Sequence, residues 1–104
     1  MAWRSLTPFA RSIYVQLAQR YNGRNNGAIG LSQRDAASLC GMSKVTARKA
    51  LLELQDRGFV ELAKQGAFSI KLRHAAEWRL TAFRDDVTGA PASKAFMRWR
   101  PARD

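Results

Sequence analysis

Two short amphipathic segments that meet at Gly41 constrain the fold more than any other feature of this sequence. Ser32 opens the first segment and Asp35 follows three residues later, a spacing typical of a capped helix start. Gly41 is expected to end this helix, because glycine adopts left-handed backbone at little cost. Ser43 then caps a further helix over residues 43–57. Two helices joined by so short a turn must cross at a steep angle.

The apolar residues of both segments recur with the helical period, which predicts one buried face on each helix. These residues are Ala36, Leu39 and Cys40 in the first segment and Ala47, Ala50, Leu51 and Leu54 in the second. The opposite side of the second segment carries Lys44, Arg48 and Lys49 near its start. This helix would therefore pack on a core through one face and present cations to a partner through the other.

A longer helix is predicted before this pair, over residues 8–21. Thr7 precedes Pro8, and a cap residue followed by proline is typical of a helix start. Its apolar stripe comprises Ala10, Ile13, Tyr14, Leu17, Ala18 and Tyr21. The Asn- and Gly-rich run 22–27 ends the helix, and the short apolar stretch 28–31 is expected to form a small strand.

The apolar period changes from 3.6 to 2 after Gly58, which predicts β-strands. The alternating segments are FVELAK, FSIKLR and EWRLTAF, with Trp78 of the third expected in the core. Gln65 and Gly66 form a turn signal between the first two segments. Either the second or the third segment could return to the first as a basic hairpin, and we expect both to take part.

The last part of the chain, residues 84–104, is predicted to be a partly irregular, basic extension of a single domain over residues 1–83. Gly89, Pro91 and Pro101 disfavour regular structure there. Phe96, Met97 and Trp99 are nevertheless too apolar for a solvated tail. We expect these three residues to pack on the domain or to form the contacts of a homodimer.

The charge balance favours a polyanionic partner. The 104 residues include 18 Lys plus Arg against eight Asp plus Glu, a formal net charge of +10. Thirteen of the cations are Arg, whose planar fork suits phosphate and guanine. An anionic membrane surface is the weaker alternative, since basic amphipathic helices also bind such surfaces. With no apolar run of membrane-spanning length and no secretory signal, the chain is expected in the cytoplasm.

The residue patterns do not indicate an enzyme, a metal site or a cofactor. The run GRNNGAIG lacks the Lys-Ser/Thr of a phosphate loop, and the adjacent Asp85 and Asp86 have no partner His in the predicted loop. His74 has no second ligand at metal-binding spacing. Cys40 is the only cysteine, so an internal disulfide is excluded, and we interpret it as a buried core residue rather than a redox sensor.

The segment LSQRDAASLCGMSKVTARKALLELQDRGFVEL, residues 31–62, resembles the winged helix-turn-helix of bacterial transcription factors, most closely the GntR type and more distantly the MarR type. The whole chain is similar to small standalone proteins of this kind from proteobacterial mobile elements and prophages. The resemblance implies an α+β fold, a three-helix core with a β-hairpin wing. No effector domain follows the wing, so small-molecule control is not expected.

By this resemblance and by charge, the expected DNA contacts fall on the two helices and the wing. They are Arg34, Ser43, Lys44, Val45, Thr46, Arg48, Lys49, Gln65, Gly66, Lys71 and Arg73. Arg34 and Thr46 would bind mainly phosphates, whereas Lys44 and Arg48 would reach base edges. We expect a sequence-specific double-stranded DNA-binding protein that regulates transcription. The alternatives are a protein–protein adaptor in replication or transcription and an architectural DNA binder without base specificity.

Overall fold

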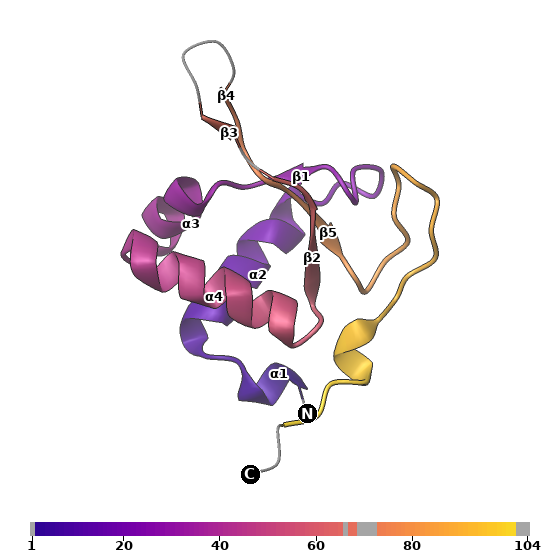
Figure 1. Ribbon diagram of the computed structural model, residues 1–104, viewed down its shortest axis with the longest axis horizontal. Helices are drawn as coiled ribbons and strands as arrows, with labels where there is room; N and C mark the ends of the chain where they lie inside the picture. The colour runs from indigo at the N-terminus through magenta and orange to yellow at the C-terminus, as the bar shows by residue number, and fades with distance from the viewer. Residues whose placement is uncertain (1, 66, 69–72, 102–104) are drawn as a thin grey trace.

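The computed structural model describes residues 2–65, 67–68 and 73–101 and shows an α+β arrangement (Figure 1). The helices are α1 (Ala2–Ser5), α2 (Pro8–Arg20), α3 (Gln33–Cys40) and α4 (Lys44–Asp56), with a 3-10 helix, η1, at Ala95–Met97. The strands are β1 (Ile29–Gly30), β2 (Val60–Lys64), β3 (Ala67–Phe68), β4 (Arg73–His74) and β5 (Glu77–Leu80). Helix α1 was not predicted from the sequence, and the other three helices were.

Three predicted cap residues begin the longer helices. The hydroxyl oxygens of Thr7, Ser32 and Ser43 accept the backbone N–H three residues on, at 3.2, 3.0 and 3.1 Å respectively. Thr7 also ties α2 to α4, because its N–H and its hydroxyl both donate to the carboxylate of Glu53. The caps therefore set both where the helices start and how two of them pack.

Two predicted glycines end helices in left-handed backbone. Gly41 has φ +64° after α3, and Gly58 has φ +83° after α4. The backbone N–H of Met42 donates to the carbonyl of Ala37, and that of Phe59 donates to the carbonyl of Leu54. These bonds satisfy carbonyls that the last helical turn leaves open. The chain thus leaves each helix in a defined direction.

The core lies between the helices and one face of the sheet. Among the buried residues are Ala10, Ile13, Leu17, Ile29, Leu31, Ala36, Ala47, Ala50, Leu51, Leu54, Val60, Trp78 and Leu80. The indole N–H of Trp78 donates to the carbonyl of Leu31 at 2.9 Å, so its one polar atom is satisfied inside the core. The predicted core positions of Trp78 and of α4 are confirmed.

Leu39, Cys40 and Ala18 were predicted to lie on buried faces, and the structure corrects Leu39 and Ala18, whereas Cys40 packs against the core. Leu39 is 52% exposed, Ala18 is exposed and Cys40 is half-buried. Helix α3 has only eight residues and is buried through Ala36 and Ala37. Its narrow buried face leaves the last turn, with Leu39, turned to solvent. Burial still raises the pKa of the Cys40 thiol, which disfavours a reactive thiolate.

The main sheet has the strand order β1-β5-β2 and is antiparallel throughout. Leu62 of β2 pairs with Trp78 of β5, and Ile29 of β1 pairs with Trp78 from the other side. The returning strand is therefore the EWRL segment. The small strand expected within residues 28–31 is confirmed as β1.

The FSIKLR segment also takes part, but not as one strand. Phe68 pairs with Arg73 in the second, two-stranded sheet, so the chain reverses after Phe68. Gln65 and Gly66 were predicted to be the turn between the first two segments; Gln65 follows β2, and Gly66 lies outside the described residues. Alternation of apolar residues identifies extended backbone but carries no information on where it folds back.

The C-terminal extension packs on the domain through Phe96 and Trp99, which confirms one of the two expectations for these two residues but not for Met97. The ring of Phe96 stacks on that of Phe59 at 5.0 Å between centroids, with 4° between the ring planes. The guanidinium of Arg57 lies 5.1 Å from the centroid of the Trp99 ring. Thr81 donates its hydroxyl to the carbonyl of Gly58 at 2.6 Å, and its own carbonyl accepts the backbone N–H of Lys94.

Buried polar groups hold the start of this extension. The Asp85 side chain is 1% exposed and accepts hydrogen bonds from the backbone of Val87 and Thr88 and from Arg79. Arg79 also pairs with Glu61 at 2.8 Å. The bonds from Thr88 and Arg79 are the main causes that lower the pKa of Asp85 to about 2. Asp85 therefore lies in a partnered site, which the sequence did not indicate.

Candidate nucleic-acid interface

The turn between α3 and α4 is held by its own polar side chains. The amide nitrogen of Gln33 donates to the carbonyl of Lys44 at 3.2 Å, which joins the start of α3 to the start of α4. Ser43 donates its hydroxyl to that of Thr46 at 3.0 Å and accepts the Thr46 N–H. These hydrogen bonds fix the position of the first turn of α4 before any partner binds to it.

The first turns of α4 present cations to solvent. Lys44, Arg48 and Lys49 are exposed, as is Val45, and the first turn contains no acidic residue. Within the described part of the chain, none of these three cations forms an ion pair. Their charges are therefore not neutralised within the fold and remain available to an anion.

Arg34 belongs to the same region. It follows Gln33, whose contact with Lys44 places the start of α3 beside the first turn of α4, and it is exposed. Arg34 also forms no ion pair among the residues that the structure describes. The structure thus brings the predicted residues of α3 and α4 to one surface.

Ser43 and Thr46 contribute differently from the cations. Both hydroxyls are engaged in the cap of α4, and Thr46 is half-buried. Their first role is to fix the helix start, so any contact with a ligand has to share atoms with the cap. The sequence predicted both a helix cap at Ser43 and DNA contacts by Ser43 and Thr46, but it could not show that the same hydroxyl groups would serve both roles.

The hairpin formed by β3 and β4 projects from the body of the molecule (Figure 1). Lys64 ends β2, and Lys64 and Gln65 are exposed. Arg73 lies in β4, opposite Phe68. The predictions for Gly66 and Lys71 fall outside the described residues. Of the wing residues predicted to bind DNA, Arg73 thus lies on the projecting hairpin and Gln65 lies between β2 and β3.

Three exposed apolar residues lie on or near α4, and of these only Val45 was predicted as part of the site. Val45 is 63% exposed and Leu52, seven residues on, is 50% exposed. Leu39, at the end of α3, adds a third exposed apolar side chain. The seven-residue offset between Val45 and Leu52 is a signal that they share the outer face of α4. This face therefore combines cations with apolar groups.

Comparison of the chain with protein-family models, curated proteins and solved structures found no match. The described residues contain no group of three or more His, Cys, Asp or Glu that could hold a metal ion. No helix in that part of the chain has the length and apolar character needed to cross a bilayer.

The residues predicted as dimer contacts lie away from the α4 cations. Phe96 and Trp99 are half-buried, whereas Met97 is 64% exposed. Phe96 and Met97 belong to η1 and Trp99 follows it; η1 lies close to α1, while the start of α4 lies beside α3 (Figure 1). The molecule thus has two separate surfaces with unusual composition.

Proposed function

We propose that this chain is a winged helix-turn-helix protein that binds double-stranded DNA with sequence specificity and regulates transcription. In this proposal α3 and α4 form the helix-turn-helix, α4 enters the major groove and the β2–β5 hairpin is the wing. The observation that carries it is the exposed set Lys44, Arg48 and Lys49 on the first turns of a helix whose start is fixed by a tight turn.

The chemistry of the exposed side chains distinguishes those suited to base contacts from those suited to phosphate contacts. Arg48 can form a bidentate contact with guanine, worth roughly 1–3 kcal/mol of discrimination between bases. Arg34 at the start of α3 would neutralise a phosphate and set the register. Val45 offers an apolar surface to a thymine methyl group. The resemblance of residues 31–62 to the GntR type supports the same division.

The experiment that tests the proposal is selection from random DNA duplexes at about 150 mM salt, with sequencing of the bound fraction. Wild-type protein and Arg48→Ala are run in parallel. We expect an enriched motif with a specificity ratio of about 10³ or more over random DNA, and loss of information at one or two positions in the variant. Salt-sensitive binding without an enriched motif would contradict sequence-specific recognition and favour an architectural binder.

A further inference from the structure

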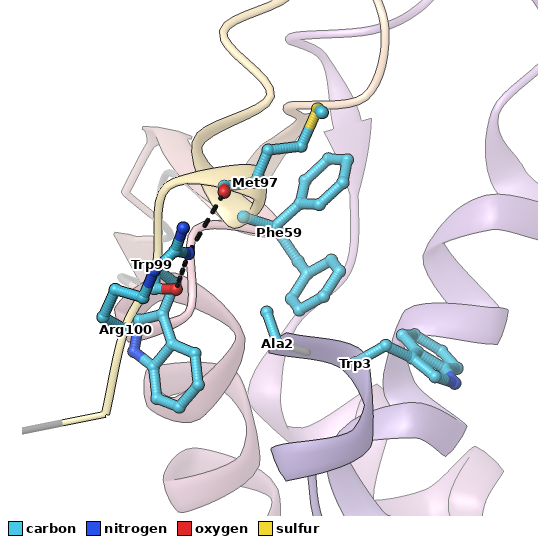
Figure 2. A pocket seen from close by; sticks show the side chains of 7 residues that line it. Ala2, Trp3, Phe59, Met97, Trp99 and Arg100 are labelled. Atoms are coloured by element: carbon cyan, nitrogen blue, oxygen red, sulfur yellow. Dashed lines mark hydrogen bonds between the residues drawn. The ribbon is translucent and has the colours of Figure 1, made fainter.

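An apolar groove of about 350 Å³ lies between α1 and the C-terminal extension (Figure 2). It is lined by Ala2, Trp3, Phe59, Met97, Trp99 and Arg100, among others. Its floor is held by ring contacts, because the Phe59 ring is stacked against Phe96 and meets the Trp3 ring edge to face at 5.7 Å. Pockets for ligands start at about 300 Å³, so the groove can take an apolar anchor.

The groove remains open although its composition favours burial. Trp3 is 39% exposed and Met97 is 64% exposed at its edge. Exposed apolar surface next to a preformed hollow is typical of a binding surface for another macromolecule. The chemistry of that partner is indicated by the charges around the groove.

The described residues that line the groove include one cation, Arg100, and no acidic residue. Two further exposed arginines are sequence neighbours of lining residues, because Arg98 lies between Met97 and Trp99 and Arg4 follows Trp3. Arg98 donates to the carbonyl of Ser93, and Arg100 donates to that of Trp99 at 2.8 Å. None of the three arginines forms an ion pair within the described residues, so their charges remain uncompensated.

We propose that this groove binds an acidic peptide segment of a partner protein. An apolar side chain of the peptide enters between Trp3 and Met97, and a carboxylate beside it pairs with Arg100. The α4 cations lie elsewhere on the molecule, so the peptide and DNA can bind together (Figure 1). The proposal is independent of DNA binding.

Two other occupants fit the groove less well. A second copy in a two-fold dimer would bring its own Arg100 towards this one, which costs energy through like-charge repulsion. A single-stranded nucleic acid needs cations along its phosphate track, but the groove walls are apolar and Arg100 is the one charged residue among the described ones that line it. An acidic, apolar peptide complements both the walls and the edge.

The test is selection of random displayed peptides on the full chain, followed by binding assays with the most enriched peptide. Met97→Glu and Arg100→Glu place a negative charge in the groove, and Val87→Glu is the matched control. Val87 is 66% exposed, close to the 64% of Met97, and does not line the groove. We expect enriched peptides that combine Asp or Glu with large apolar residues.

Binding of the chosen peptide should weaken about tenfold or more in both groove variants and stay unchanged in Val87→Glu. Circular dichroism and thermal unfolding show whether each variant is folded. Absence of acidic peptides among the enriched ones, or unchanged binding in both folded variants, would overturn the proposal. A dimer that Met97→Glu dissociates would assign the groove to a second copy instead. Binding of a single-stranded oligonucleotide that the same variant abolishes, without peptide binding, would assign it to nucleic acid.

Discussion

Asn26 pairs with Leu80 through both polar atoms of its side-chain amide. Its Oδ1 accepts the Leu80 N–H at 2.7 Å, and its Nδ2 donates to the Leu80 carbonyl at 2.9 Å. The side chain is fully buried, and Nδ2 also donates to the carbonyls of Phe83 and Arg84. The Asn26 side chain thus pairs with the backbone N–H and carbonyl at the end of β5, as the backbone of a neighbouring strand would. Its bonds to Phe83 and Arg84 also fix the start of the C-terminal extension.

Asn26→Ala should lower the free energy of unfolding by about 2–4 kcal/mol, because it leaves the buried backbone groups of Leu80 without partners. Urea denaturation measures this loss. Asn22→Ala is the matched control. Its side chain is exposed and accepts from the N–H of Arg24, so we expect a loss below about 1 kcal/mol. Equal losses in the two variants would show that the buried pairing contributes nothing beyond a local turn.

A second prediction concerns Gly58, where the extension crosses the end of α4. A Cβ atom there would lie 2.7 Å from the backbone carbon of Ala95 and the nitrogen of Phe96, and the φ of +83° adds strain. We expect Gly58→Ala to cost about 2–4 kcal/mol. It should also speed amide hydrogen exchange at Met97 and Arg98, whose N–H groups are bonded within η1.

Gly41→Ala separates backbone strain from the steric clash. Gly41 has a φ of +64°, but among the described residues other than its two chain neighbours no atom lies within 4 Å of the position that a Cβ would take, so its substitution should cost about 1–2 kcal/mol through strain alone. It should leave exchange at Met97 unchanged. If both variants accelerated exchange at Met97 equally, the close approach at Gly58 would not be what holds η1.

Helix ends could be predicted from the sequence because their signals are local. The Ser43 cap acts on a residue three positions away, and the glycines at 41 and 58 act on their own backbone. The cations of α4 could be placed on the outer face for the same reason, since the helical period fixes which residues share a side.

Features that depend on distant residues could not be predicted. Helix α1 has only four residues, which is too short for a recognisable helical pattern. It borders a groove that the distant C-terminal extension completes, so its position depends on residues far away in the sequence. The sequence indicates only a loop at Asp85, because its partner Arg79 lies in β5 and its backbone donors require a specific turn. The groove itself joins three separate parts of the chain, although the sequence analysis correctly identified Trp99 as too apolar for a solvated tail.

The third prediction is a pH dependence of stability from Asp85. Its pKa is about 2 in the folded protein against an ordinary 3.8, so the folded state favours the carboxylate. The resulting stabilisation is present in full above about pH 5 and is lost as the pH falls from about 4 to about 2. We expect about 1–2 kcal/mol, allowing for solvent screening around the partly exposed Arg79.

Asp85→Asn provides the comparison for this effect. The difference in unfolding free energy between wild type and Asp85→Asn should shrink by about 1–2 kcal/mol between pH 5 and about pH 2. Chemical denaturation at a series of pH values measures this difference. A difference that stays constant over the range would mean that the carboxylate gains nothing from its contacts with Thr88 and Arg79.

The last prediction separates base recognition from phosphate binding within the proposed interface. Arg48→Ala should weaken binding to a selected duplex by about 1–3 kcal/mol and binding to random duplexes much less. Arg34→Ala should weaken both alike and reduce the slope of log K against log salt by about 1, because one fewer counterion is released. Titrations of both duplexes at several salt concentrations measure the two quantities together. Lys94→Ala is the control, since Lys94 is exposed at the start of η1, near the C-terminal end of α4 and away from its first turns, and it should affect neither affinity. Equal losses on both duplexes for Arg48→Ala would remove its base-reading role and leave α4 as a phosphate-binding helix.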